Sequence, residues 1–334
     1  MIKRLFCMAV TLLVLCSCSN VYRYTESTFF SMSTFVTVIS DDENAGAVVE
    51  RQTREYEKKL SRTVDSSEIS ILNKNGSAKV SEETALLLNK SLEIAKNTQG
   101  TFNPCLASVV SLWDITSGKD YVPDDEKIML ALKHTDYNVV TVDGDTVNVN
   151  DARVDLGAIA KGYILGQVMN SAKESGAKNI CISLGGNVGV CGSSASRQEN
   201  GLDGWSVGIT NPFNKEQTLG NIVLCDSYIS VSGAYERYFE KDGEIYHHIF
   251  DSSTGKPAKS DIASSCVVSE DAALGDALST ALFVMGSEKA VQLYNSGIYE
   301  FEMILIMNDK RILVTDGLKD DFVVTDKNFL VIDA

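Results

Sequence analysis

The stretch AALGDALSTALFVM, residues Ala272–Met285, is an apolar run long enough to form a buried helix. Asp276 and Thr280 lie four residues apart within it, so their side-chain oxygens share one face of that helix. A carboxylate in such surroundings is costly unless it is paired or binds a cation. A carboxylate together with a hydroxyl suits Mg²⁺ that also contacts a phosphate ligand. The alternative is an aspartate bonded to backbone near a helix start, and the pair alone does not decide between the two.

The segments around this helix alternate between strands and helices without a regular βαβ order. The patterns predict strands at Phe35–Ser40, Ile180–Leu184, Trp205–Ile209 and Ser264–Ser269. They predict helices at Ala45–Leu60, from Ser81 to Gly100 and at Ser287–Ser296. Hairpins are expected at 139–149, 235–249 and 303–315, the first two around Asp-Gly turns. Because hairpins dominate, we expect an α+β fold: a single compact domain with mixed or mostly antiparallel sheets and flanking helices.

The first residues are typical of an export signal. Lys3 and Arg4 precede the apolar stretch Leu5–Leu15, which is too short to span a bilayer. Leu15-Cys16-Ser17-Cys18 resembles a bacterial lipobox, in which Cys18 would be lipidated; the alternative is an ordinary signal peptide with incidental cysteines. We therefore expect a signal peptide at 1–17, a lipidated tether at 18–27 and a domain at 28–334. The protein would be exported and anchored on the outer face of a bacterial membrane, periplasmic or at the cell surface.

Charge and cysteine content exclude several classes of protein. The formal net charge is −15, which would repel a phosphate-rich polymer, so no nucleic-acid partner is expected. Five cysteines follow the export segment, an odd number spread through strand-like stretches. They are interpreted as small buried residues and not as a disulfide framework. Because the chain has no Cys-x-x-Cys pair, a structural zinc site is not expected.

A second segment whose residues could carry a chemical function is DLGAIAKGY, residues Asp155–Tyr163. Its glycines and alanines let a ligand approach the backbone closely, and Lys161 is a point charge suited to phosphate. Asp155 could hold an amide or hydroxyl of a ligand. The alternative is a strand-to-helix turn with a solvated lysine. The segment is not a Walker loop, because it lacks the required glycine and lysine spacing.

Three further segments carry weaker signals. His247 and His248 are adjacent on an expected strand, so at most one should reach a pocket, and either could be purely structural. Gly185-Gly186 follows a buried strand and Ser232-Gly233 precedes a hairpin, where small residues permit close approach of a flat or phosphorylated ligand. Phe102-Asn103-Pro104 follows the stop at Gly100 and could be only a loop initiator.

Taken in order, these segments resemble the ApbE family, the FAD:protein FMN transferases, from about Met32 to Phe283. Asp155–Tyr163 is close to the family's Asp-Leu-Gly-Gly-Ile-Ala-Lys-Gly-Tyr, and Asp276–Thr280 matches its Asp-Ala-x-x-Thr. The other similar stretches are Met32-Ser33-Thr34, Leu60-Ser61 with Ser67-Glu68-Ile69 and Asn73, Phe102-Asn103-Pro104, and His248 to Pro257.

The resemblance implies a function and a set of site residues. Such enzymes use Mg²⁺ and move FMN from FAD onto a Ser or Thr hydroxyl of a partner protein, releasing AMP. Implied metal ligands are the Asp276 carboxylate, the Thr280 hydroxyl and the Ala158 carbonyl. The flavin and its phosphate arm would lie near Met32, Thr101, Phe102, Asn103, Asp155, Lys161 and Phe250. Lys161 would add a second positive centre, and His248 would be the base for the acceptor hydroxyl, with Asp155 as its rival.

The partners implied by the resemblance are extracytoplasmic flavoprotein subunits of Rnf-type or sodium-pumping NADH:quinone oxidoreductase complexes. Their acceptor loop is typically Asp-Gly-x-[Ser/Thr]-Gly-[Ala/Ser]-[Thr/Ser]. The chain departs from the family pattern where Asn103 replaces an acid, Ser33 replaces a glycine, and Thr63 stands where many members carry a tyrosine. Losing that ring weakens or redirects FAD binding. An FAD pyrophosphatase that forms FMN and AMP is therefore an alternative, and a non-catalytic flavin-binding lipoprotein is another.

Overall fold

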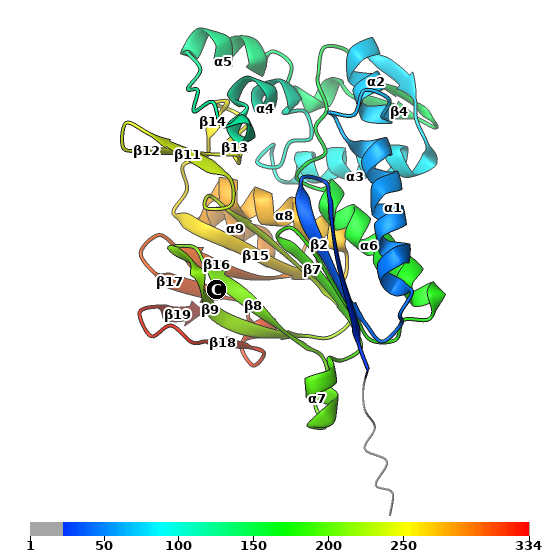
Figure 1. Cartoon of the computed structure of the whole chain (residues 1–334). Helices are drawn as coiled ribbons and strands as arrows, with labels where there is room; N and C mark the ends of the chain where they lie inside the picture. Colours follow the sequence, from blue (N-terminus) through cyan, green and yellow to red (C-terminus); the bar gives the residue numbers. More distant parts are fainter. Residues whose placement is uncertain (1–22, 334) are drawn as a thin grey trace, which may run out of the picture.

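The computed structural model describes residues 23–333 (Figure 1). The predicted signal peptide, the lipidation site Cys18 and the first part of the tether lie outside the described residues. None of the helices within residues 23–333 is long and apolar enough to cross a membrane.

A nine-stranded sheet forms the centre of the molecule. All neighbouring strands in it are antiparallel except the pair β17–β19, which confirms the expected α+β fold with mostly antiparallel sheets. The strand order is β1 (Thr25–Ser31), β2 (Thr34–Ser40), β6 (Ile180–Leu184), β7 (Asn187–Cys191), β10 (Tyr228–Gly233), β15 (Ile262–Ser269), β16 (Glu302–Met307), β17 (Arg311–Val314) and β19 (Leu330–Asp333).

Both faces of this sheet are covered, and for this reason all eight residues of β15 are buried. Val267 belongs to the core beneath the helices, whereas its neighbour Cys266 belongs to the core on the other face, as the alternation of strand side chains requires. The helices are α1 (Ala45–Leu60), α6 (Ala160–Ser175), α8 (Ala272–Met285) and α9 (Ser287–Asn295). The other face is covered by a second sheet of β8 (Trp205–Asn211), β9 (Asn214–Leu224) and β18 (Phe322–Val324).

A largely helical region lies beyond one end of the central strands (Figure 1). It contains α2 (Glu68–Asn75), α3 (Glu82–Asn97), α4 (Ala107–Trp113), α5 (Asp125–Leu132) and a small sheet of β3 (Ser77–Lys79), β4 (Thr141–Asp143) and β5 (Thr146–Asn148). Two hairpins adjoin it, β11 (Tyr238–Lys241) with β12 (Glu244–His247), and β13 (Phe250–Asp251) with β14 (Lys256–Pro257). The short helix α7 (Ala195–Glu199) lies at the opposite end.

Most predicted elements are present, and two helices have the predicted bounds, α1 and α8. Two expectations need correction. β1 begins at Thr25, inside the predicted tether 18–27, because its backbone pairs with β2. The cysteines of residues 23–333 are free, and Cys105 and Cys266 are buried as expected, but Cys225 is exposed because it follows the end of β9.

The crossing of α6 and α8 depends on Gly162. An ideal Cβ atom on Gly162 would lie 2.1 Å from the carbonyl oxygen of Ala272 and 2.6 Å from Cβ of Asp276. The two helices therefore touch at backbone distance at this point. One turn later a Cβ on Gly166 would lie 3.7 Å from Cβ of Ala272, which is ordinary contact.

We expect Gly162→Ala to destabilise the protein by about 1–3 kcal/mol, because the added methyl group must push the helices apart. Gly166→Ala is the matched control in the same helix, and it should stabilise by about 0.5–1 kcal/mol, because alanine favours a helix over glycine. Urea unfolding midpoints measure both. Equal shifts for the two variants would show that the crossing has room to spare.

Candidate functional site

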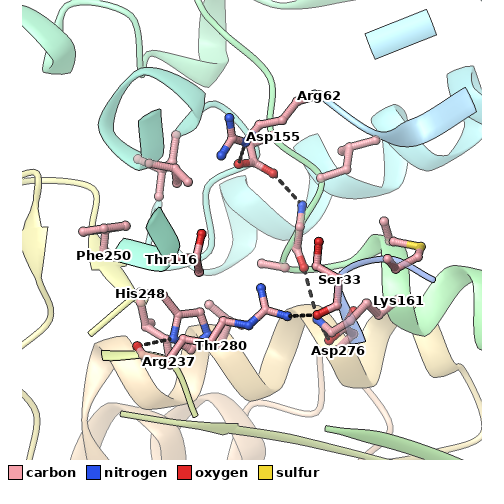
Figure 2. A pocket seen from close by; sticks show the side chains of 18 of the residues that line it. Ser33, Arg62, Thr116, Asp155, Lys161, Arg237, His248, Phe250, Asp276 and Thr280 are labelled. Atoms are coloured by element: carbon pink, nitrogen blue, oxygen red, sulfur yellow. Dashed lines mark hydrogen bonds and ion pairs between the residues drawn. The ribbon is translucent and has the colours of Figure 1, made fainter. Parts of the chain in front are cut away.

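A cavity of about 320 Å³ lies between the end of the central sheet and the helical region (Figure 2). Its walls come from the β1–β2 turn, the end of α1 and the loop after it, the loop after α3, α4 and the turn after it, the segment leading into α6, the stretch from β10 to β13, and α8. Ten predicted site residues line it, namely Met32, Thr101, Asn103, Asp155, Ala158, Lys161, His248, Phe250, Asp276 and Thr280.

Phe102 is the predicted flavin-binding residue that does not line this cavity. Its side chain is 1% exposed and belongs to the hydrophobic core beneath the sheet. The ring is therefore a packing residue in this structure, and the prediction that the flavin lies near Phe102 stays a prediction.

Asp276 is almost fully buried on α8 and has two different environments for its two carboxylate oxygens. Oδ2 accepts a hydrogen bond of 2.8 Å from the backbone N–H of Gly162 in the first turn of α6, where the N–H groups have no partner within the helix. Oδ1 lies 3.7 Å from Nζ of Lys161 (Figure 2). One oxygen is thus used to join two helices, while the other faces the cavity beside a lysine. The backbone partner of this aspartate is thus present, at the start of α6, and its role as a metal ligand stays a prediction.

The other proposed metal ligands also offer hard oxygen atoms at this wall. Oγ1 of Thr280 lies 3.2 Å from Oγ of Ser232, which lies 2.8 Å from Oγ of Ser279. Ala158 lines the cavity immediately before α6. Within residues 23–333 no group of three His, Cys, Asp or Glu side chains is arranged to hold a metal ion. A cation here would therefore need hydroxyl, carbonyl and ligand oxygens in addition to one carboxylate, a donor set that fits Mg²⁺ bound to phosphate.

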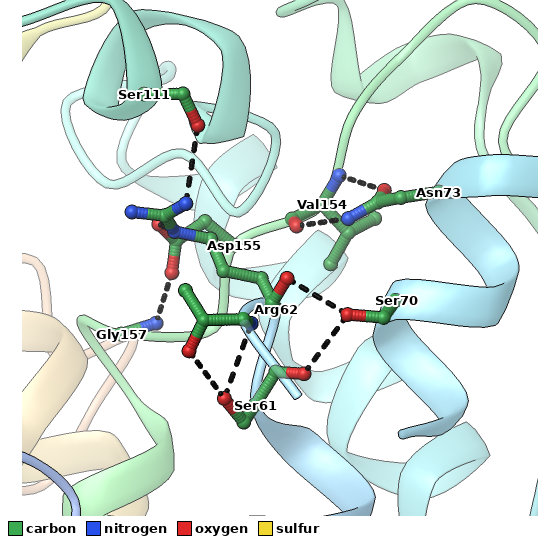
Figure 3. A network of polar contacts seen from close by, with 9 residues as sticks. Ser61, Arg62, Ser70, Asn73, Ser111, Val154, Asp155 and Gly157 are labelled. Carbon is green, nitrogen blue, oxygen red and sulfur yellow. Dashed lines mark hydrogen bonds and ion pairs between the residues drawn. The ribbon is translucent and has the colours of Figure 1, made fainter. Parts of the chain in front are cut away.

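Asp155 is engaged on the opposite wall (Figure 3). Its Oδ2 lies 2.6 Å from Nε of Arg62, and its Oδ1 accepts a 2.8 Å hydrogen bond from the N–H of Gly157. Arg62 also donates to Oγ of Ser111 at 3.1 Å. Both oxygens of Asp155 are occupied, so this carboxylate positions the loop before α6 more readily than it accepts a proton.

The residues around Leu60 and Asn73 that carry the family resemblance hold this wall in place. Asn73 exchanges two hydrogen bonds of 2.7 Å with the backbone of Val154, immediately before Asp155. Ser67 caps α2 by accepting from the N–H of Ser70, and its hydroxyl donates to the carbonyl of Ser61. These contacts place Arg62 and Asp155 next to each other although they are far apart in sequence.

The contacts of Asn103 show why an amide stands where the ApbE pattern has an acid. Its Nδ2 donates to the carbonyl of Thr135 at 3.0 Å, and its Oδ1 accepts from the N–H of Cys105 at 2.8 Å. A carboxylate could make only the second of these bonds, because an ionised acid has no donor. The amide therefore joins the turn after α3 to the loop after α5.

The β1–β2 turn brings Met32 and Ser33 to the cavity in an uncommon backbone conformation. Their φ angles are 52° and 57°, in the left-handed region that side-chain-bearing residues rarely adopt. The turn is held by Glu57, which accepts from the Ser31 hydroxyl at 2.5 Å and from the Met32 N–H at 3.0 Å. Arg237 donates to the Ser33 carbonyl at 3.3 Å. The strain is thus stabilised on both sides of the turn, next to the cavity.

The two small-residue motifs make room for protein side chains and not for a ligand. A Cβ on Gly186 would lie 2.8 Å from Oε1 of Glu236, and a Cβ on Gly233 would lie 2.3 Å from the ring of Tyr235. Neither glycine lines the cavity, although Ser232 does. The expectation that these glycines admit a ligand is therefore corrected: they admit Glu236 and Tyr235.

The two histidines diverge as the strand alternation predicts. His247 is buried against Phe283, and its Nε2 lies 3.1 Å from the carbonyl of Ala258. His248 lines the cavity, and its Nδ1 lies 3.2 Å from the carbonyl of Arg237. Because a carbonyl only accepts, this contact assigns the proton to Nδ1 and leaves Nε2 with a free lone pair. Burial, followed by the charges of Arg237 and Lys161, lowers the pKa of His248 to about 3.

The sequence interpretation missed five charged residues of the cavity, which are Glu57, Arg62, Asp114, Glu236 and Arg237. Glu236 lines the cavity, and the loss of water around its carboxyl group raises its pKa. The positive charges of Lys161 and Arg237 oppose this shift. Arg62 follows a recognised motif, and Glu236-Arg237 follows the Ser232-Gly233 turn, so their positions beside motifs were the available signals. Charged residues next to a turn are common at protein surfaces. Only the tertiary structure shows that these particular residues line the cavity.

Comparisons with known proteins agree with the family resemblance of the residues that line the cavity. The model of the ApbE family matches residues 28–305. The FAD:protein FMN transferase of Treponema pallidum is 34% identical over 302 residues, which cover 83% of this chain and 81% of that protein. The FAD:protein FMN transferase of Klebsiella pneumoniae is 29% identical over 326 residues, or 95% of this chain and 98% of that protein.

A solved structure supports the same assignment. The crystal structure of the ApbE protein from Thermotoga maritima has a TM-score of 0.78 and 31% sequence identity, and the match covers 88% of this chain and 98% of that one. The family match spans most of the chain, the similar proteins are matched over most of their length, and the motifs that carry the resemblance surround one cavity. The chain belongs to the ApbE family.

Proposed function

We propose that this protein is an FAD:protein FMN transferase that forms a phosphoester between FMN and a Ser or Thr hydroxyl of a partner protein. The observation that carries the proposal is the position of Asp276 and Thr280, which lie at one wall of the cavity beside Lys161. The names of the similar proteins in Treponema pallidum and Klebsiella pneumoniae support it.

The reaction exchanges the phosphoanhydride bond of FAD for a phosphoester bond to the acceptor. The acceptor oxygen attacks the phosphorus atom of the FMN half, the bond from that phosphorus to the bridging oxygen breaks, and AMP leaves with that oxygen. The Asp276 carboxylate, the Thr280 hydroxyl and the Ala158 carbonyl would hold Mg²⁺, which neutralises diphosphate charge when bound. Gly162 uses only one oxygen of Asp276, and the other, which lies 3.7 Å from Nζ of Lys161, would be the metal ligand.

Two cations of the chain would bind the diphosphate. Lys161 donates to the Gly157 carbonyl at 3.2 Å and lies near Asp276, so its position is fixed before a ligand arrives. Arg237 forms no ion pair within residues 23–333 and uses one donor on the Ser33 carbonyl. Its remaining N–H groups are therefore available to phosphate oxygens, which guanidinium groups bind well.

His248 is better placed than Asp155 to receive the acceptor proton. Asp155 already uses both oxygens, whereas Nε2 of His248 has its lone pair free. Its low pKa makes His248 neutral in the free enzyme. An anionic diphosphate bound between Lys161 and Arg237 would offset the two charges that lower this pKa and would make Nε2 a stronger proton acceptor.

We expect the imidazole of His248 to stay neutral from pH 8 to pH 5 in the folded, ligand-free protein, because its pKa of about 3 lies below that range. The unfolded protein takes up the proton near pH 6.5. This group therefore stabilises the fold fully above pH 6.5, and that contribution is lost as the pH falls toward 3. Histidine NMR titration measures it, with the signal assigned by its absence in His248→Gln. An inflection of this signal near pH 6.5 would contradict the burial argument.

The pyrophosphatase alternative differs only in the attacking group, with water replacing the partner hydroxyl. Thr63 supports this alternative. Its side chain lines the cavity, is exposed, and forms a 3.0 Å hydrogen bond with the Ser61 hydroxyl. No ring at this position stacks on the adenine. A flavin-binding lipoprotein without chemistry is the remaining alternative.

One assay separates the three functions. The protein is incubated with FAD, Mg²⁺ and an acceptor protein that carries the family's loop motif. We expect flavin fluorescence on the acceptor in a denaturing gel, with one AMP released per label. Free FMN and AMP without labelling would identify a pyrophosphatase, and intact bound FAD would identify a binder; either result would overturn the transferase proposal.

The variant Asp276→Ala serves as the control for the metal. It should lose turnover by a factor of at least about 100 at millimolar Mg²⁺, on the scale of a lost metal ligand, and calorimetry should show loss of Mg²⁺ binding. The helix contact with Gly162 is also lost, so circular dichroism must first show that the variant is folded. Folded protein with near-normal turnover would remove Asp276 from the metal site.

We further propose that the protein is an exported lipoprotein, lipidated at Cys18, which acts on extracytoplasmic flavoprotein subunits of Rnf-type or sodium-pumping NADH:quinone oxidoreductase complexes. The direction of β1 supports this arrangement. Tyr24 is fixed at one end of the sheet by its hydroxyl on the Ser193 carbonyl at 2.6 Å, and β1 then leads to Met32 at the cavity. Seven extended residues span about 23 Å, so an anchored N-terminus would leave the cavity facing away from the membrane.

We expect radiolabelled palmitate to label the protein in a bacterial host and Cys18→Ser to abolish the label and release the protein from the membrane fraction. The physical reason is that the membrane affinity would come from the acyl chains. Cys16→Ser is the control, because it leaves Cys18 in place. Membrane association that survives Cys18→Ser would contradict the anchor.

A further inference from the structure

Seven serine and threonine side chains line the cavity, and most of them are already hydrogen-bonded to the protein. The five hydroxyls with a partner are those of Ser61, Thr63, Thr101, Ser232 and Thr280. The hydroxyls of Ser33 and Thr116 have no hydrogen-bond partner within residues 23–333. An unpaired hydroxyl is the chemical group onto which the proposed reaction moves FMN, so both residues are candidates for modification.

Thr116 belongs to the short 3₁₀-helix η1 (Ile115–Ser117), which follows α4 and is fixed by the residues beside Thr116. Ile115 packs against the apolar cluster between α4 and α5. The Ser117 hydroxyl donates to the Asp114 carbonyl at 2.8 Å. Both neighbours of Thr116 are thus used by the fold, and the Thr116 side chain is left exposed to the cavity.

The η1 helix lies beside the part of the chain that carries the proposed base. It contacts β11, the strand that begins directly after Arg237. The backbone N–H of His248 donates to the Arg237 carbonyl at 3.1 Å, and Nδ1 of the His248 ring lies 3.2 Å from the same oxygen. Figure 2 shows Thr116 on the side of the cavity that carries His248 and Phe250. Thr116 and the proposed base therefore occupy the same part of the cavity.

Ser33 lies on the other side of the cavity, toward Lys161 (Figure 2). A Cβ on Gly185 would lie 3.4 Å from Oγ1 of Thr34 and 3.6 Å from Cδ of Lys161, so the β1–β2 turn borders that lysine. In an in-line displacement the attacking and leaving oxygens lie on opposite sides of the phosphorus atom. Because Lys161 would bind the diphosphate and its leaving oxygen, the attacking hydroxyl comes from the side of Thr116 and not from that of Ser33.

We propose that Thr116 is an FMN acceptor within this chain, so that the protein flavinylates itself when no partner occupies the cavity. The proposal rests on the transferase function. Oγ1 of Thr116 attacks the phosphorus atom of the FMN half of FAD, and the bond from that phosphorus to the bridging oxygen breaks. AMP leaves with that oxygen, and the hydroxyl proton passes to Nε2 of His248. The product is a phosphoester between FMN and Thr116, and nothing is oxidised or reduced.

Incubation of the full-length protein with FAD and Mg²⁺, without any acceptor, tests the proposal. The intact mass is measured before and after FAD is added, so that label acquired in the expression host is counted. We expect the mass to rise by that of FMN less water, an equal amount of AMP to form, and peptide mass spectrometry to find the label on Thr116. A protein that flavinylates an acceptor but never carries label itself would overturn the proposal.

Three variants assign the label to one hydroxyl. Thr116→Val removes the hydroxyl and nearly keeps the side-chain shape, so it should lose the label. Thr116→Ser retains a hydroxyl and should be labelled at the same position. Ser117→Ala is the matched control on the same helix and should keep the label, because Ser117 bonds to Asp114 and does not line the cavity. Label that survives Thr116→Val, on Ser33 or elsewhere, would contradict the assignment.

Transfer within one chain and transfer between two copies differ in their dependence on protein concentration. A hydroxyl held in the cavity reacts without a binding step, so the first-order rate constant at saturating FAD should stay the same over about a tenfold dilution of the protein. Asp276→Ala keeps Thr116 but should be inactive, and it should stay unlabelled when mixed with the wild-type protein. Label on Asp276→Ala in this mixture would show transfer between copies and would overturn the assignment of Thr116 as an acceptor in its own chain.

The outcomes separate this inference from the function on which it rests. If the wild-type protein labels neither itself nor an acceptor protein, the transferase function fails and the inference fails with it. If it labels an acceptor protein and not itself, the function stands and Thr116 is not an acceptor. Label on Thr116 without any acceptor protein present would support both.

Discussion

The hydrogen bond from the Gly162 N–H to Oδ2 of Asp276 joins the start of α6 to the middle of α8, and the cavity is built around it. It satisfies a backbone donor that the first turn of a helix leaves open, and it partly compensates a buried charge. Only glycine allows the two helices to come this close. The same bond turns the other oxygen of Asp276 toward Lys161, so one contact serves both packing and chemistry.

The two walls of the cavity differ in how completely their charges are satisfied. On one wall, Arg62 and Asp155 neutralise each other and are tied to backbone and hydroxyl groups. On the other, Oδ1 of Asp276 has only the longer contact with Nζ of Lys161, at 3.7 Å, and Arg237 forms no ion pair in the described chain. Unsatisfied charges in partly desolvated surroundings interact strongly with an incoming ligand. The first wall therefore shapes the cavity, and the second is the wall at which we propose that the ligand binds and reacts.

Local backbone strain is confined to the edge of the same cavity. Met32 and Ser33 adopt left-handed angles at the turn between β1 and β2, where glycine would be less strained. Glu57 and Arg237 hold them there. The turn lies between the cavity and the exposed pair Phe30 and Phe35, so the strained residues border the cavity.

Patterns within a few neighbouring residues were sufficient to predict α8 with Asp276 and Thr280 on one face, the hairpins, and the opposite directions of His247 and His248. Helical and strand periodicity are set by local backbone geometry, and for this reason they can be read from the chain. The partners of these groups could not be read in the same way. Gly162 meets Asp276 across 114 residues, Arg62 meets Asp155 only when Asn73 has fixed Val154, and Gly186 faces Glu236 and not a ligand. Such contacts depend on how distant segments pack around a shared core, which is a property of the folded whole and of no segment alone.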